Sequence, residues 1–157
     1  MERQRLETPL GMVTVRVNDN GAVVSIAFDD TVSAHGERKV AGDRRAVDQL
    51  DRYFKGELTE FDLELDPEGT DFEKCVWNEL RRIPYGSTTT YGEIAARLGD
   101  LNATRAVGTA NARNPIAVVI PCHRVIGADG ELTGYAGGLH RKRWLLAHEA
   151  GQQDLEF

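Results

Sequence analysis

Residues 90–112 read TYGEIAARLGDLNATRAVGTANA and carry the start and stop signals of two short helices. Thr90 and Glu93 have the spacing of a capping box, in which each side chain bonds the other residue's backbone N–H, and Gly99 ends the helix that they begin. Asn102 stands where it would cap a second helix. Two short helices joined by so few residues suggest a helix-turn-helix, although any hairpin of helices rich in small residues has the same pattern.

Another capping box, formed by Thr70 and Glu73, predicts a helix before this pair. The apolar residues that follow at helical spacing are Phe72, Cys75, Val76, Leu80 and Ile83. Because Cys75 shares this apolar face, we expect its thiol to be buried and structural. Residues 139–149 are predicted to form a last helix before Gly151.

The first 66 residues have the pattern of a small sheet with one helix. Residues 13–17 alternate valine with polar side chains, the turn sequence NDNG follows, and residues 23–28 continue as a second strand. Residues 43–55 carry apolar side chains at helical spacing, and residues 61–65 alternate like a third strand. The sequence DPEG that follows is the expected linker to the rest of the chain.

We therefore predict an α+β protein with two domains. Residues 1–68 form an N-terminal domain, a three-stranded antiparallel sheet with a helix, and residues 152–157 form a tail. Residues 69–151 form a mostly helical domain that contains the helix-turn-helix and a short strand carrying the PCHR motif. That strand is the apolar run IAVVI, residues 116–120, directly before Pro121.

The composition is that of a soluble globular protein, with 41% hydrophobic and 28% charged residues among 157. No apolar run approaches the ~20 residues of a membrane span. With two cysteines and a charged start without a secretory signal, we expect a protein of the reducing cytoplasm. The net charge of −6 argues against nucleic acid as a partner, but its distribution does not, because residues 91–150 carry five acidic and seven basic side chains.

Cys122 stands at the boundary of an element, after Pro121 and before His123 and Arg124. Cationic neighbours lower the pKa of a thiol and raise its thiolate fraction, so these residues favour a reactive cysteine, while a buried structural thiol remains the alternative. A zinc site does not fit, because one cysteine and the scattered histidines match no zinc spacing.

His123 cannot easily be the direct base of Cys122, because adjacent side chains diverge along an extended backbone. A bridging water could transfer the proton, with an acid from elsewhere orienting the imidazole. Glu149, near the end of the last predicted helix, is one candidate for that acid, and a solvated glutamate is the alternative. Taken singly, Tyr91, Arg105 and Asn114 have equally ordinary interpretations as packing, surface and turn residues.

Taken together, three segments have a specific pattern. IPYGSTTTYGEIAARLG, TRAVGTANARNPIAVVIPCHRVIG and GYAGGLHRKRWLLAHEA resemble, in order and spacing, the methylated-DNA–protein-cysteine methyltransferases, the O6-alkylguanine-DNA alkyltransferases of direct DNA repair. The resemblance runs from about Phe72 to Ala150, half the chain. PCHRV in register with RAVG, NP and GYAGGL is its most specific part, and the N-terminal part resembles the family only in layout.

This resemblance implies that Cys122 is the alkyl acceptor, activated through a water by His123, which Glu149 orients. The thiolate attacks the alkyl carbon, guanine O6 leaves, and the thioether is not cleaved again, so each molecule acts once. The expected partner is double-stranded DNA containing O6-alkylguanine, and activity on O4-alkylthymine stays open. The resemblance implies no cofactor, no membrane contact and a monomer.

The resemblance also implies that the helix-turn-helix binds the minor groove, where Tyr91 rotates the damaged nucleotide out of the stack and Arg105 fills its place. Small residues would allow the close approach, among them Ala106 and Gly108. The residues that line or brace the guanine pocket by this resemblance are Asn114, Val125, Tyr135, Ala136 and Gly137. Asn114 would tie the two halves of the site together, and carbonyls near Cys122 and Val125 would read the guanine amino group.

Three departures refine this interpretation. The N-terminal domain lacks the cysteines with which animal members bind zinc, so we predict no metal. The non-catalytic alkyltransferase-like proteins carry tryptophan at the acceptor position, where this chain has Cys122. Ala136 stands where some relatives have serine, which would alter the alkyl groups that fit. A non-catalytic lesion-binding protein and, further off, a cysteine hydrolase remain the alternative functions.

Overall fold

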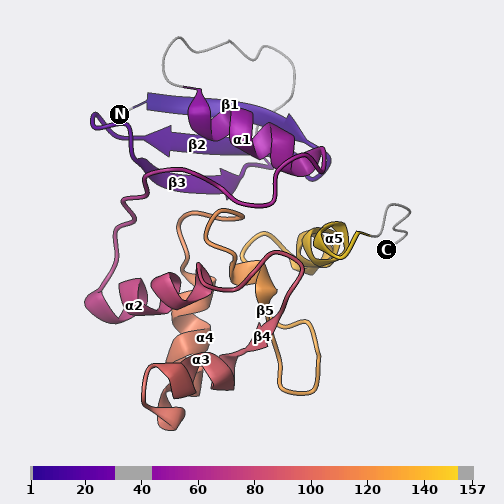
Figure 1. Ribbon diagram of the computed structural model, residues 1–157. Helices are drawn as coiled ribbons and strands as arrows, with labels where there is room; N and C mark the ends of the chain where they lie inside the picture. The colour runs from indigo at the N-terminus through magenta and orange to yellow at the C-terminus, as the bar shows by residue number, and fades with distance from the viewer. Residues whose placement is uncertain (1, 31–43, 152–157) are drawn as a thin grey trace. The chain divides into compact units, whose positions relative to one another are not determined.

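The computed structural model describes residues 2–30 and 44–151, and the predicted tail lies outside them (Figure 1). The chain divides into two compact units, the first comprising Met1–Glu68 and Pro115–Ala117, the second Gly69–Asn114 and Val118–Phe157. The short stretch around Ile116 belongs to the first unit because Ile116 forms a β-bridge with Ile26.

The first unit is built on an antiparallel sheet in the order β1-β2-β3, with bounds Glu2–Thr8, Gly11–Val17 and Val23–Phe28. The turn between β2 and β3 follows from its sequence. The Asn18 side chain accepts the backbone N–H groups of Asn20 and Ala22, both at 3.0 Å, and Gly21 takes a positive φ of 82°. The predicted three-stranded antiparallel sheet is confirmed.

One of its strands was predicted wrongly. Residues 61–65 are not a strand, and in this segment only Leu65 forms a β-bridge, to Val23. The third strand is β1. Its charged residues do not alternate with apolar ones, so the sequence did not indicate a strand there. A tight turn joins β1 to β2, with the Thr8 hydroxyl donating to the Gly11 carbonyl at 2.7 Å, so β1 pairs along its whole length at little loop-closure cost.

Helix α1 (Arg45–Phe54) lies across one face of this sheet (Figure 1). Its apolar side chains recur at helical spacing and are buried: Ala46, Val47, Leu50, Tyr53 and Phe54. The helix matches the prediction over residues 43–55 to within two residues at each end, the precision expected of helix boundaries.

Helix α2 (Asp71–Leu80) opens the second unit with the predicted capping box, since the Thr70 side chain accepts from Glu73 and the Glu73 carboxylate accepts from Thr70. Trp77 is buried and its indole Nε1 donates to the Ala110 carbonyl at 2.9 Å. The predicted burial of Cys75 was wrong, because its thiol is exposed. The buried side of α2 is centred on Val76, Trp77 and Leu80, and Cys75 lies outside it.

The two helices of the predicted helix-turn-helix are α3 (Tyr91–Arg97) and α4 (Thr104–Ala112), joined through the 3-10 turn η1 (Leu101–Ala103). Thr90 caps α3 by accepting from the Glu93 N–H at 3.1 Å. The second bond of the predicted capping box, from the Thr90 N–H to the Glu93 carboxylate, does not form.

The Glu93 carboxylate instead accepts from the Thr89 hydroxyl at 2.6 Å. Asn102 does not act as the predicted cap. Asp100, two residues earlier, instead caps η1, where its carboxylate accepts from the Asn102 N–H at 2.9 Å, and α4 begins after Ala103 without a side-chain cap. Aspartate and asparagine cap helices about equally well, so the sequence alone did not distinguish these two positions.

The predicted strand over residues 116–120 does not form. Val118 has a positive φ of 72°, which a strand cannot accommodate and which a β-branched residue adopts rarely. The PCHR motif therefore follows a bend in the backbone and not a strand, and residues Cys122–Arg124 form the 3-10 turn η2. The short strand is β5 (Val125–Ile126), directly after the motif.

β5 pairs in parallel with β4 (Thr89–Thr90), which leads into α3. The chain continues through a loop to α5 (Leu139–Glu149), which has the predicted bounds. In the part of the chain that the structure describes, no helix has both the length and the apolar character needed to cross a bilayer.

Candidate active site

Cys122 is held at the start of η2 and is 6% exposed. Its backbone N–H donates to the Ile120 carbonyl at 2.8 Å, and the Asn114 side chain donates to the same carbonyl at 2.8 Å. The Asn111 amide approaches the Cys122 carbonyl at 3.4 Å. The two asparagines, from the end of α4 and just beyond it, therefore fix the backbone on both sides of the cysteine.

The next residue of the motif, His123, is bonded to the far end of α5. Its Nε2 donates to Glu149 Oε2 at 2.8 Å, and both side chains are buried. The structure thus brings together the three residues that the sequence proposed as a unit, Cys122, His123 and Glu149. His123 Nδ1 is buried and has no hydrogen-bond partner among the described residues, so it is the ring nitrogen that can accept a proton.

Arg124 completes this cluster and was not foreseen. Its Nε and Nη2 donate to the two carboxylate oxygens of Glu149 at 2.7 and 3.0 Å, and its Nη1 donates to the Ile83 carbonyl at 2.7 Å. A bidentate arginine–carboxylate pair is among the stronger hydrogen-bonded contacts in proteins. Its place in the PCHR motif was the available signal, because an arginine that is buried beside the site needs a partner of opposite charge.

These contacts set the charges of the cluster. Burial alone would raise the pKa of Glu149, but the hydrogen bonds from His123 and Arg124 and the charge of Arg124, joined by that of His123 once it is protonated, hold its pKa at about 2. Burial lowers the pKa of His123, and the Glu149 contact offsets this only in part. Glu149 is therefore a carboxylate balanced by Arg124, and His123 is a neutral imidazole.

Cys122 does not have the lowered pKa that its cationic neighbours suggested. Burial raises the pKa of its thiol, although a hydrogen bond from Asn114 and the charge of Lys142 act in the opposite direction. The local prediction failed because the thiol is buried, and the nearest arginine charge, that of Arg124, is paired with Glu149. The resting cysteine is a thiol, so its reaction requires a base in the site.

Lys142 of α5 was also missed. It is completely buried, and its Nζ donates to the Val125 carbonyl at 2.6 Å and to the Thr133 carbonyl at 2.7 Å. Burial lowers the pKa of Lys142, and a thiolate at Cys122 would act in the opposite direction. The available signal was compositional, because Lys142 is the one lysine after residue 74 in a chain that otherwise uses arginine there.

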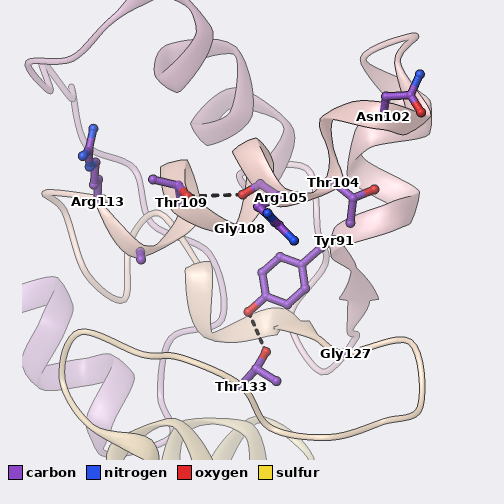
Figure 2. A pocket seen from close by; sticks show the side chains of 10 residues that line it. Tyr91, Asn102, Thr104, Arg105, Gly108, Thr109, Arg113, Gly127 and Thr133 are labelled. Carbon is purple, nitrogen blue, oxygen red and sulfur yellow. Dashed lines mark hydrogen bonds between the residues drawn. The ribbon is translucent and has the colours of Figure 1, made fainter.

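An open groove lies along α3 and α4, and Figure 2 shows its lining side chains. The groove is lined by three of the residues that were predicted to contact DNA, Tyr91, Arg105 and Gly108. The Thr133 hydroxyl, from the loop before α5, donates to the Tyr91 hydroxyl at 3.0 Å (Figure 2). Ala106 is exposed on α4 but is not among the lining residues.

Apart from Asn114, which lies just beyond α4, the predicted pocket residues lie on β5 and in the loop that follows. Val125 is buried in β5. The Tyr135 hydroxyl is buried without a hydrogen-bond partner among the described residues, and burial raises its pKa well above the ordinary value, with the nearby Cys122 adding to this. Ala136 is exposed, and the Gly137 carbonyl accepts from Arg141 at 3.0 Å.

Comparison with known proteins identifies the family. The profile of the 6-O-methylguanine DNA methyltransferase DNA binding domain matches residues 71–151, and that of the ribonuclease-like domain of the same proteins matches residues 3–67. The chain belongs to the methylated-DNA–protein-cysteine methyltransferase family. The resemblance inferred from the PCHRV, RAVG and GYAGGL motifs is thereby confirmed.

Individual members of the family match over most of the chain or over about two thirds of it. The methylated-DNA–protein-cysteine methyltransferase of Mycolicibacterium paratuberculosis is 50% identical over 155 residues, which cover 95% of this chain and 92% of that protein. The methyltransferase of Mycobacterium tuberculosis is 64% identical over 104 residues, 66% of this chain and 63% of that protein.

Solved structures of the family have the same fold. The O6-methylguanine methyltransferase of Mycobacterium tuberculosis matches with a TM-score of 0.86 at 45% identity, over 99% of this chain and 96% of that one. The same organism's protein in complex with DNA matches with a TM-score of 0.87 at 47% identity, over 97% and 94%. The predicted α+β fold class is confirmed.

The described residues contain no cluster of potential metal ligands. Within residues 2–30 and 44–151, no group of three histidine, cysteine, aspartate or glutamate side chains is placed to hold an ion. The prediction that the protein needs no metal or cofactor stays a prediction.

Proposed function

We propose that this protein repairs DNA by transferring the alkyl group of O6-alkylguanine irreversibly to Cys122, once per molecule. The observation that carries the proposal is the buried hydrogen bond of 2.8 Å between His123 and Glu149, directly beside a buried thiol. It leaves His123 with one free basic nitrogen in a site where the cysteine needs a base.

The reaction begins when a water passes the Cys122 proton to Nδ1 of His123. The sulfur then attacks the alkyl carbon, the S–C bond forms, and the C–O6 bond breaks with its electron pair moving to the guanine. The proton held by His123 returns through water to the purine, so the products are an S-alkylcysteine and guanine. A thioether is a poor leaving group, so the S-alkylcysteine is not cleaved again.

The base must leave the stack to reach Cys122, because a thiol inside the protein cannot attack within a duplex. We assign the extrusion to α3 and α4, with Tyr91 rotating the nucleotide and Arg105 occupying the vacated position. The exposed Ala106 and the groove residue Gly108 allow α4 to approach the minor groove closely. The structure of a relative in complex with DNA supports DNA as the partner.

The guanine pocket would be formed by β5 and the loop before α5. Tyr135, Ala136 and Gly137 line it, and the carbonyls of Cys122 and Val125 accept from the guanine amino group. The Val125 carbonyl accepts from Lys142 and has a second lone pair for the ligand. The Cys122 carbonyl already accepts from the Val125 N–H and, at 3.4 Å, from Asn111, so the guanine amino group would replace the long Asn111 contact. Asn114 braces the segment before Cys122 through the Ile120 carbonyl. We further infer a monomer that acts in the cytoplasm.

The deciding experiment measures the mass of the intact protein after incubation with a duplex that contains O6-methylguanine. We expect each molecule to gain the mass of one methylene unit and no more, and we expect the Cys122→Ala variant to gain none. Unmodified wild-type protein after a stoichiometric incubation would refute the proposal. A parallel duplex with O4-methylthymine shows whether the pyrimidine lesion is also a substrate.

The same assay separates the two alternatives. A protein that binds the lesion duplex without any mass gain is a non-catalytic lesion-binding protein. A hydrolase would instead release its product repeatedly and leave Cys122 unmodified after many turnovers. The His123–Glu149 contact fits a hydrolase equally well, but a hydrolase gives no account of the groove along α3 and α4.

A further inference from the structure

We propose that Thr133 is a positioning residue for base extrusion, because its hydroxyl holds the Tyr91 ring in a fixed orientation before DNA arrives. This inference rests on the proposed function. It assigns a role to a loop residue that neither the motifs nor the comparisons single out, and it concerns the free protein rather than the chemistry at Cys122.

The Tyr91 ring has contacts on two sides. Tyr91 is the first residue of α3, and its ring lies against the backbone of α4 at Gly108, where an added Cβ would be 3.8 Å from Tyr91 Cδ1. At the far end of the ring, the hydroxyl accepts from Thr133 at 3.0 Å (Figure 2). The Gly108 contact limits the position of the ring, and the Thr133 bond fixes its direction.

Thr133 can exert this effect because its own backbone is anchored. The Lys142 ammonium donates to the Thr133 carbonyl at 2.7 Å and to the Val125 carbonyl at 2.6 Å. Lys142 is completely buried in α5, so it joins the exposed loop residue to the core of the unit. A continuous series of hydrogen bonds therefore runs from Lys142 through Thr133 to Tyr91.

The size of the effect follows from the exposure of the bond. Thr133 is exposed and Tyr91 is half-buried, so water competes for both hydroxyls. A hydrogen bond between neutral groups in such a place changes an equilibrium by about three- to tenfold. Its benefit is pre-organisation, because an untethered tyrosine must lose its side-chain freedom each time it rotates a nucleotide.

The test compares two rates, alkyl transfer from an O6-methylguanine duplex and transfer from free O6-benzylguanine, and uses their ratio. Tyr91 acts on the duplex, so a loss of positioning lowers this ratio. We expect Thr133→Val, which keeps the shape and removes the hydroxyl, to lower it about fivefold. Thr133→Ser keeps the hydroxyl and should restore most of the ratio.

A double-mutant cycle with Tyr91→Phe shows whether the effect passes through the phenol. With the phenol absent, Thr133→Val should cause no further fall in the ratio. A fall of the same size in both backgrounds would show that Thr133 acts elsewhere, and an unchanged or raised ratio in the single variant would refute positioning. Wild-type transfer from the duplex is measured in the same series, so failure of the proposed function itself would be recognised separately.

Discussion

Arg124 donates to both carboxylate oxygens of Glu149, at 2.7 and 3.0 Å, across 25 residues of sequence. This pair explains how Glu149 can remain ionised in a buried site while His123 stays neutral. The carboxylate has its charge balanced by Arg124 and needs only a hydrogen bond from His123. The imidazole is therefore oriented by Glu149 and still free to accept a proton at its other nitrogen.

Replacing Arg124 with lysine should destabilise the protein by about 3 kcal/mol, because a lysine cannot make the bidentate contact and leaves the buried Glu149 charge poorly compensated. Urea denaturation measures the change. Arg82→Lys is the matched control, since Arg82 makes a single 3.4 Å contact to Glu79 with a side chain that is 74% exposed, and it should change the stability by under about 0.5 kcal/mol. Equal effects of the two substitutions would contradict this account.

Acidification should destabilise the protein in two steps. Burial lowers the pKa of His123 from its ordinary 6.5. As the pH falls below 6.5, His123 therefore binds a proton more readily in the unfolded chain than in the folded protein, and stability that is present above pH 6.5 is lost. Glu149 adds a second loss as the pH falls from 4.5 to about 2. Each group contributes a slope of at most about 1.4 kcal/mol per pH unit.

The two steps are assigned by substitution. Denaturation curves for His123→Gln, recorded from neutral to acid pH, should lack the first loss and keep the second. If the wild type and this variant fall in parallel below pH 6.5, the buried neutral imidazole is not the cause.

Gly69 should tolerate no side chain, although it lies in an exposed stretch. An added Cβ would overlap Cη2 of the buried Trp77 ring and would be 2.6 Å from its Cζ3. We expect Gly69→Ala to cost about 1–3 kcal/mol through overpacking. The matched control is Gly92→Ala in α3, where the nearest atom is 3.9 Å away and alanine should stabilise the helix by up to about 1 kcal/mol. Thermal unfolding compares both variants, and a neutral Gly69→Ala would contradict the predicted clash.

The elements that local chemistry specifies were predicted well. The capping box at Thr70 and Glu73 and the helix over residues 139–149 formed as expected, because caps and helical periodicity are properties of neighbouring residues. β1 was missed because its charged side chains give no alternation of apolar residues, and its stability comes from pairing with β2. The strand over residues 116–120 failed because Val118 adopts a positive φ that its sequence does not favour.

The residues of the site likewise divide into those that the local sequence predicts and those that depend on contacts between distant segments. Cys122 and His123 are adjacent in sequence, so their proximity was certain. Glu149 was one candidate for the acid, and the family resemblance selected it. The charge balance could not be predicted, because it depends on Arg124 reaching across the fold to Glu149 and on Lys142 reaching the loop carbonyl of Thr133. The burial of Cys122, which also depends on the packing of distant segments, raises its pKa and overturned the expected low value.

The proposed role of Arg105 predicts a loss that depends on the substrate. Arg105 is exposed on α4 and lines the groove beside Tyr91 (Figure 2). Removing a nucleotide from the stack costs a few kcal/mol, and an inserted arginine offsets part of that cost. Arg105→Ala should therefore slow repair in a duplex by roughly 10- to 100-fold, and should slow transfer from free O6-benzylguanine much less, because the free base leaves no gap.

Arg113→Ala is the control for charge. Arg113 lines the same groove with a side chain that is 69% exposed and lies 3.7 Å from Glu73, so its loss removes a positive charge without removing an intercalating group. Raising the salt concentration should weaken duplex binding of the wild type, because contacts to phosphate release counterions. Arg105→Ala should remain defective at low salt, where Arg113→Ala recovers. Losses of equal size on the duplex and on the free base would show that Arg105 shapes the pocket and does not enter the stack.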